Sequence, residues 1–232
     1  MPRSSDAARP SGVVVPDAVV DVGTPVGLAR AHVHDPADGR RPAGVLVLGH
    51  GAGGGIGAPD LQVAAAVAVA GGWRCVLVEQ PWRVAGGKVA PAPARLDTGW
   101  LAVLAALADD ALAGPGTGTG PLVVGGRSAG ARVACRTALT TGAAGVLCLA
   151  FPLHPPGRPE KTRSGELAGA GVPVHVVQGR RDPFGGPAEV EALGLEGVLV
   201  TAVEGDHGLK PSAGPDGAVA AAVRVLLATF SG

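Results

Sequence analysis

Short, continuously apolar runs recur along the chain and alternate with longer segments of helical length. Apolar runs without polar alternation are typical of strands that are covered on both faces, as in a parallel sheet. Strands that alternate with helices predict a three-layer αβα sandwich, an α/β fold built on a mostly parallel sheet. The predicted strands are 45–48, 75–78, 122–124, 145–150, 172–177 and 198–203, and the predicted helices are 60–72, 96–114, 129–142, 187–194 and 217–230.

The N-terminal part follows a different pattern. Residues 1–12 are polar and contain proline, so we expect a disordered tail followed by a single domain over residues 13–232. In GLARAHVH (27–34) polar and apolar residues alternate, and DPADG follows, which indicates an antiparallel N-terminal edge strand and a hairpin. Asp60 and Asp97 are candidate N-caps of the first two predicted helices.

Composition narrows the class of protein. A chain of 232 residues, 47% of them apolar, is within the size range of one α/β domain. Charged residues make up 16% and balance to a formal net charge of zero, which argues against a partner made of nucleic acid. The N-terminus has no signal-peptide pattern and no apolar run is long enough to span a membrane. We expect a cytoplasmic monomer or homodimer without a membrane partner.

Cysteine and histidine spacing gives little support for a metal site. The three cysteines form no C-x-x-C pair, and each lies in an apolar run, so we expect reduced thiols in the core. His32 and His34 share one face of the edge strand near Asp35, but an exposed edge with two or three ligands is a weak basis for metal binding. We therefore expect neither a metal nor a cofactor.

The most specific motif is GGRSAG, which follows a predicted strand and precedes a predicted helix. It contains G-x-S-x-G, with Ser128 at the centre and Gly126 and Gly130 two residues away on either side. In this context the motif predicts a nucleophile elbow, a strained turn that presents the serine hydroxyl at the edge of the sheet. The glycines are needed because side chains at their positions would collide with neighbouring backbone.

Two further loops contain the partners that a serine nucleophile needs, a base and an acid that orients it. Asp182 follows one predicted strand, in QGRRDPFG, and His207 follows the next, in EGDHG. The order Ser128, Asp182, His207 is that of the α/β-hydrolases. Asp206 is adjacent to the base, and chain neighbours rarely face one another, so Asp182 is preferred as the acid. For Asp182 the alternative is an Asp-Pro turn without a catalytic role.

The loop GHGAGGG (49–55) allows two interpretations. It spells the G-x-G-x-x-G of a dinucleotide-binding turn, and Glu79 stands where a ribose-binding acid would stand. Further glycines and a proline intervene before a helix can start, however, and about 44 residues precede the motif. The alternative is an oxyanion hole, in which backbone amides hold the charge that develops on a substrate carbonyl. The predicted donors are Ala52, with Gly51 as its alternative, and Ala129.

With these residues the chain resembles the α/β-hydrolase superfamily, on its dienelactone-hydrolase-related side. More narrowly, it is similar to the group of testis-expressed protein thirty and its bacterial relatives. The resemblance covers about residues 44–210 through GHGAGG, EQPWRVAGGK, GGRSAGAR, FPLHPPGRPEK, QGRRDPFG and GDHGLK. It implies the hydrolase fold and the triad, but no substrate. One departure is that dienelactone hydrolases typically use cysteine as the nucleophile, where this chain has Ser128.

We expect a serine hydrolase acting on a small carboxylic ester, lactone or thioester, with a minimal lid because only about 20 residues separate FPLHPPG from the next strand. Basic residues are frequent in the predicted rim loops, which suggests a substrate with an anionic group. The candidate substrate-binding residues are Arg127, His154 and Arg83. The alternative is that these arginines are solvated or structurally paired. The competing function is a non-catalytic protein-interaction module that retains the fold.

Overall fold

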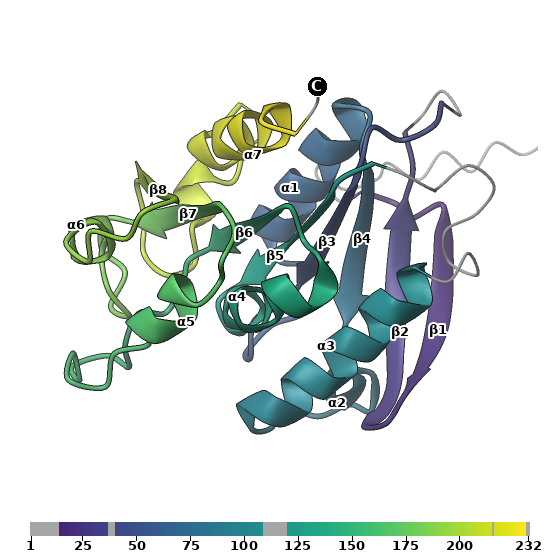
Figure 1. The fold of residues 1–232 in the computed structure, drawn as a ribbon, viewed down its shortest axis with the longest axis horizontal. Helices are drawn as coiled ribbons and strands as arrows, with labels where there is room; N and C mark the ends of the chain where they lie inside the picture. Colours follow the sequence, from purple (N-terminus) through teal and green to yellow (C-terminus); the bar gives the residue numbers. More distant parts are fainter. Residues whose placement is uncertain (1–13, 37–39, 109–119, 215, 231–232) are drawn as a thin grey trace, which may run out of the picture.

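The computed structural model describes residues 14–36, 40–108, 120–214 and 216–230. An eight-stranded sheet with the order β1-β2-β4-β3-β5-β6-β7-β8 forms its centre (Figure 1). The strands are β1 (Ala18–Thr24), β2 (Gly27–His34), β3 (Val45–Gly49), β4 (Arg74–Glu79), β5 (Leu122–Arg127), β6 (Gly145–Leu149), β7 (Val174–Gly179) and β8 (Val198–Val203). Strands β3 to β8 are parallel, and β2 pairs antiparallel with both β1 and β4. The predicted α/β fold is confirmed, whereas the predicted tail, residues 1–12, lies outside the described residues.

Helices cover both faces of the sheet, which explains the apolar runs without alternation (Figure 1). On one face α1 (Pro59–Ala70) and α7 (Ala218–Ala228) pack over a cluster that includes Leu46 and Leu48 of β3. On the other face α3 (Pro93–Ala108) and α4 (Ala129–Thr141) pack over a cluster that includes Val47. Successive residues of β3 therefore belong to different clusters, and Leu46, Val47 and Leu48 are all fully buried.

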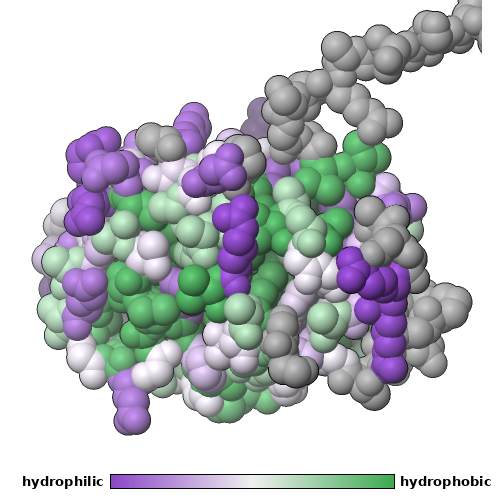
Figure 2. Space-filling model, turned by 90° about the horizontal axis from the view of Figure 1, so that it is seen from above, coloured by the Kyte–Doolittle hydropathy of each residue, from purple (hydrophilic) through white to green (hydrophobic). Residues whose placement is uncertain are grey.

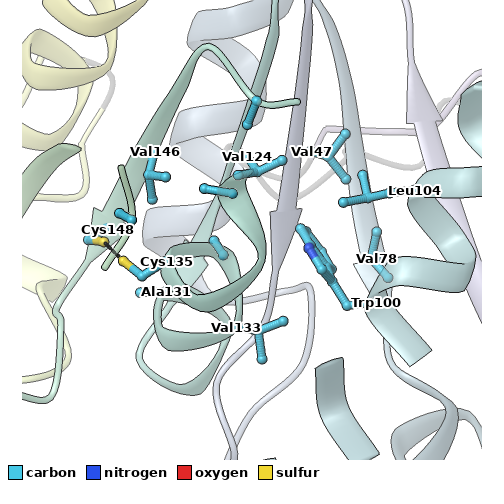
Figure 3. Packing of buried hydrophobic residues seen from close by; sticks show 14 of the residues in the cluster. Val47, Val78, Trp100, Leu104, Val124, Ala131, Val133, Cys135, Val146 and Cys148 are labelled. Atoms are coloured by element: carbon cyan, nitrogen blue, oxygen red, sulfur yellow. Dashed lines mark hydrogen bonds between the residues drawn. The ribbon is translucent and has the colours of Figure 1, made fainter. Parts of the chain in front are cut away.

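Trp100 forms the centre of the cluster under α3 and α4. Figure 3 shows its indole beside Val47 and Val78 of the sheet and Val133 of α4. In the same cluster the thiols of Cys135 and Cys148 lie 3.5 Å apart, within hydrogen-bonding distance. The three cysteines are free and buried, as the sequence predicted: Cys75, Cys135 and Cys148.

The N-terminal hairpin differs from the prediction. It joins β1 to β2 through residues 25–26 and so precedes the alternating strand, whereas a hairpin was expected after it. The sequence concealed β1 because Pro16 and Asp17 interrupt the apolar run, and the strand begins only at Ala18. As a result β1 is the edge of the sheet, and β2 is paired on both sides.

The predicted N-caps are also wrong. Helix α1 begins at Pro59 and α3 at Pro93, so Asp60 and Asp97 both lie inside their helices. Proline is well suited to the first helical position, where the missing N–H would have no intrahelical acceptor. The Asp60 carboxylate is instead paired with Arg127, a contact between distant parts of the chain.

The remaining helices are short: α2 (Pro81–Val84), α5 (Ser164–Ala168), α6 (Pro187–Glu191) and the 3₁₀ helix η1 (Lys210–Ser212). Only the five residues of α5 form a helix between β6 and β7, as expected for a minimal lid. On the surface viewed in Figure 2, apolar and hydrophilic residues are interspersed. Within the described ranges, no helix combines the length and apolar character needed to cross a bilayer.

Candidate active site

The site is built around a sharp turn between β5 and α4. Ser128 occupies this turn with φ 52° and ψ −107°, a backbone conformation that residues other than glycine rarely adopt. A Cβ on Gly126 or on Gly130 would overlap the carbonyl oxygen of Gly49 on the neighbouring strand. The two glycines therefore allow β3 to approach the turn closely, which is the geometry of a nucleophile elbow.

The structure brings together the three residues predicted as a triad. His207 Nδ1 donates to Asp182 Oδ2 over 2.8 Å, because an ionised carboxylate can only accept. The other ring nitrogen, Nε2, is thereby left to accept from the Ser128 hydroxyl, 2.9 Å away. The ring of Phe184 lies over the imidazole with centroids 4.3 Å apart. This arrangement orients the base toward the serine oxygen.

The acid is buried and held by further hydrogen bonds. Asp182 Oδ1 accepts from the Phe184 amide at 2.9 Å, and Oδ2 accepts from Gln178 Nε2 at 3.0 Å. Gln178 is the penultimate residue of β7 and is fully buried. Its Nε2 also lies 2.7 Å from the Gly185 carbonyl oxygen. These contacts, together with the hydrogen bond to His207, fix the position of the Asp182 carboxylate.

The glycine loop after β3 lies beside the serine. A Cβ on Gly51 would stand 3.5 Å from Ser128 Cβ, so the backbone of this loop is in contact distance of the nucleophile. Ala52 follows in a turn closed by a hydrogen bond from Gly54 to the Gly51 carbonyl. Ala129 follows Ser128 directly and is the first residue of α4, where amides have no intrahelical acceptor. Of the residues predicted as oxyanion donors, Ala129 thus adjoins Ser128 in the chain, and Ala52 follows Gly51, which lies beside it.

His50 anchors this loop. The Gln80 backbone amide donates to His50 Nε2 at 3.1 Å, so Nδ1 carries the ring proton and donates to the Gly51 carbonyl at 2.9 Å. In a planar trans peptide the C=O and N–H point in opposite directions. The bond to Gly51 therefore directs the N–H of Ala52 away from His50. Burial lowers the pKa of His50, which keeps the ring neutral.

A small pocket opens next to Ala129. Its free volume is about 10 Å³, about enough for one water molecule. The lining is mostly apolar and includes His50, Gln80, Trp82, Leu96, Ala129 and Val133. Within the described chain, the indole nitrogen of Trp82 and the side-chain oxygen of Gln80 are buried without a hydrogen-bond partner.

The three residues predicted to bind substrate are engaged with the protein itself. Arg127 Nε lies 3.0 Å from Asp60 Oδ2, and its Nη2 donates to the His207 carbonyl. His154 is bonded through Nε2 to Glu189 and through Nδ1 to the Pro155 carbonyl. Arg83 is half-buried beside the glycine loop and donates to the carbonyl of residue 87. The bond to the Pro155 carbonyl and the Glu189 carboxylate raise the pKa of His154.

The remaining histidines have structural surroundings. His175 is buried in β7 and bonds to Thr201 Oγ1 at 2.7 Å, as a core histidine would. His34 lies near the Val15 carbonyl, while His32 lies 3.8 Å from Glu79. In the part of the chain that the structure describes, no three His, Cys, Asp or Glu side chains form a cluster suited to a metal ion.

Two residues of the site were not predicted from the sequence. Gln178 is a polar residue at the end of an otherwise apolar strand, four residues before the acid, and that position was the available signal. Asp60 was interpreted as a helix cap. Its contact with Arg127 had no local signal, because the two residues belong to different elements.

Comparison with known proteins identifies the family and the fold. Residues 42–224 match the family model described as alpha/beta hydrolase domain. An alpha-beta serine hydrolase homologue from Coxiella burnetii superposes with a TM-score of 0.71 at 15% identity, covering 94% of this chain and 99% of its own. A serine hydrolase without lid from Xanthomonas campestris gives 0.68 at 19% identity over 92% and 96%.

The esterase Est1E from Butyrivibrio proteoclasticus also superposes, with a TM-score of 0.71 at 12% identity over 91% of this chain and 98% of its own. At these identities the likeness shows the shared fold. Among curated proteins, none matches the chain. Since the family model spans most of the residues, including the elbow and both partner loops, the chain belongs to the alpha/beta hydrolase domain family.

Proposed function

We propose that this protein is a serine hydrolase that cleaves small carboxylic esters, lactones or thioesters. The observation that carries the proposal is the unbroken hydrogen-bonded path from Ser128 Oγ through the His207 ring to Asp182 Oδ2. The path connects three loops at the carboxyl ends of β5, β7 and β8, and it includes a serine held in a strained turn. Strain of this kind is common at functional sites.

In the proposed acylation step Ser128 Oγ attacks the substrate carbonyl carbon while His207 Nε2 takes the hydroxyl proton. Asp182 keeps the other ring nitrogen protonated and stabilises the imidazolium that forms. The new oxyanion accepts hydrogen bonds from the amides of Ala52 and Ala129. When the carbon–oxygen or carbon–sulfur bond to the leaving group breaks, His207 returns its proton to that group, which leaves an acyl-enzyme.

Deacylation repeats the sequence with water. His207 Nε2 takes a proton from a water molecule as its oxygen attacks the acyl carbon, and the same amides hold the second oxyanion. The bond between Ser128 Oγ and the acyl carbon then breaks, and the serine recovers the proton from His207. The net reaction consumes one water molecule and releases the acid.

The pocket beside Ala129 favours a short acyl group, because its free volume of about 10 Å³ is about that needed by one water molecule. An anionic group receives little support from the structure. Arg127 is paired with Asp60, and the exposed Arg180 and Arg181 both lie within 4 Å of Glu204. We therefore propose neutral esters as substrates, and we include lactones because the motifs resemble those of the dienelactone-hydrolase-related group.

The direct test is labelling of the folded protein by a fluorophosphonate, with the Ser128→Ala variant as the matched control. We expect the label on Ser128 in the wild-type chain and its absence in the variant. Turnover is then measured on p-nitrophenyl acetate, butyrate and octanoate and on small lactones, with acetate preferred. If folded wild-type protein neither takes the label nor hydrolyses any member of the panel, the interaction-module alternative is the better description.

A further inference from the structure

Arg127 joins three loops of the site. It stands directly before the nucleophile, and its guanidinium forms a fork between two other segments. Nε lies 3.0 Å from Asp60 Oδ2 on α1, and Nη2 donates over 2.8 Å to the main-chain carbonyl of His207. Nη1 faces the oxyanion loop, 3.3 Å from where a Cβ on Gly51 would stand. One side chain thus contacts the segments that carry the base and the predicted oxyanion donors.

The Asp60 side chain is completely buried, as is that of Asp182. Its Oδ1 accepts a hydrogen bond from the Leu61 amide at 3.0 Å. Burial raises the pKa of this carboxyl, and the neighbouring guanidinium of Arg127 opposes that rise. Because burying an ion pair costs solvation energy, two apolar residues would often give equal or greater stability. The pair therefore calls for an explanation other than stability.

We propose that Arg127 and Asp60 form a positioning clamp that holds the main chain of His207 in register with Ser128. This inference rests on the proposed function, since it concerns the base of that mechanism. The ion pair with Asp60, which lacks hydrogen-bond geometry, restrains the guanidinium electrostatically, and the guanidinium donates to the carbonyl of His207. Both nitrogens of the His207 imidazole are hydrogen-bonded, to Asp182 and to Ser128. The clamp adds a third restraint, on the backbone of His207. Arg127 is a positioning residue in this account, because it reaches the chemistry through His207.

A substrate-binding role for Arg127 fits the geometry less well. Its side chain is 19% exposed, and two of its three nitrogens are committed to Asp60 and His207. An anionic substrate would have to compete with a carboxylate that cannot leave its buried position. Lysine could not replace the arginine, because its single nitrogen lacks the planar fork that reaches two acceptors at once.

The variants Arg127→Met, Arg127→Lys and Asp60→Asn test the clamp, with Arg132→Met as the matched control. Arg132 forms a bidentate pair with Glu166 at 20% and 19% exposure, so its loss removes a similar ion pair that touches no member of the triad. Each variant is assayed on a neutral aryl ester and on its carboxylate-bearing analogue. Thermal unfolding of each variant is followed in parallel. If Arg127→Met does not fold, Arg127→Lys serves in its place, because it retains the positive charge beside Asp60.

We expect Arg127→Met to lower kcat about 10- to 100-fold on both esters with KM changed less than about threefold, as a small misplacement of a catalytic group does. The kcat values of Arg127→Lys and Asp60→Asn should lie between those of Arg127→Met and Arg132→Met. Arg132→Met should retain the wild-type kcat. A loss confined to the carboxylate-bearing ester would overturn the proposal in favour of substrate binding. Wild-type kcat in Arg127→Met, or an equal loss in Arg132→Met, would also overturn it.

A second readout does not require turnover. The proton that His207 Nδ1 donates to Asp182 gives a low-field ¹H NMR signal when the imidazole is held in place. We expect this signal in wild type and Arg132→Met, and its broadening or loss in Arg127→Met and Asp60→Asn. An unchanged signal in the clamp variants contradicts the clamp. If no ester is hydrolysed and Ser128 is not labelled, the proposed function fails while this signal still decides the clamp.

Discussion

Gln178 Nε2 donates a hydrogen bond to Asp182 Oδ2 over 3.0 Å, so the acid of the site is held by the strand that precedes it. The same nitrogen lies 2.7 Å from the Gly185 carbonyl and 3.1 Å from the Phe151 carbonyl, which ties the loop after β7 to the loop after β6. The buried amide of Gln178 thereby positions the Asp182 carboxylate, and that carboxylate in turn positions His207. The serine hydroxyl is the last member of this series of contacts.

Replacing Gln178 by Leu should lower both stability and activity. The substitution leaves the Phe151 and Gly185 carbonyls without their donor, and each unsatisfied buried group costs about 1–3 kcal/mol. Asp182 also loses one of its restraints, so we expect kcat to fall while KM stays close to wild type. Urea unfolding and steady-state kinetics measure the two effects. A stable Gln178→Leu protein with full kcat would show that the amide has no part in placing the acid.

Alanine at Gly126 or Gly130 should destabilise the protein by more than about 2 kcal/mol, because the added methyl overlaps the carbonyl oxygen of Gly49. The control is Gly165→Ala in α5, where a Cβ meets no atom within 4 Å. There the lower backbone entropy of alanine should stabilise the helix by about 0.5–1 kcal/mol. Equal effects at the elbow and in α5 would contradict the close approach of β3 to the turn.

Replacing His50 by Phe should lower kcat by at least about tenfold, since the peptide that presents the Ala52 amide loses its hydrogen bond and oxyanion donors contribute strongly to rate. KM for a small ester should change little, because the ground-state carbonyl makes weaker use of this amide. The control is His175→Gln, because this buried histidine of β7 bonds to Thr201 of β8, and β5 and β6 lie between these strands and β3. If His50→Phe turns over at the wild-type rate, the oxyanion is held without this loop.

Enlarging the pocket should change the preferred acyl length. Trp82 and Val133 contribute to its lining, and Trp82→Ala removes the larger side chain. We expect the ratio of kcat/KM for p-nitrophenyl butyrate to that for acetate to rise about 10-fold or more, since each added methylene that is buried contributes about 0.8 kcal/mol. Leu139→Ala on the exposed face of α4 is the control and should leave the ratio unchanged. An unchanged ratio in Trp82→Ala would place the acyl group elsewhere.

Burial lowers the pKa of His175 in the folded protein. As pH falls below the ordinary histidine value of about 6.5, the unfolded chain takes up a proton that the folded chain does not, so stability decreases. The decrease is at most about 1.4 kcal/mol per pH unit for one proton. His175→Gln retains a polar partner for Thr201 but does not titrate, so its stability should fall less between pH 7 and pH 5. Parallel pH curves for wild type and variant in urea unfolding would contradict this.

Much of this molecule could be predicted from local patterns. The strands from β3 to β7 were recognised because two-sided burial favours apolar residues at successive positions, a signal contained in three to six adjacent residues. Strand β8 was recognised from a similar apolar run, although it is the partly exposed edge of the sheet. The elbow was recognised for a related reason, because the requirement for glycine on both sides of Ser128 is a local steric effect. The order of Ser128, Asp182 and His207 then followed from the loops that end successive strands.

The tertiary structure decided which side chains meet across the elements. Arg127 was expected at the substrate, yet it lies between Asp60 and His207, whose positions relative to it depend on how α1 and the loop after β8 pack on the sheet. The contact of Gln178 with the Phe151 carbonyl and the pocket beside Ala129 were likewise invisible in the chain. Their physical basis is the pairing of groups far apart in sequence, and no local hydrophobic or steric pattern encodes such partners.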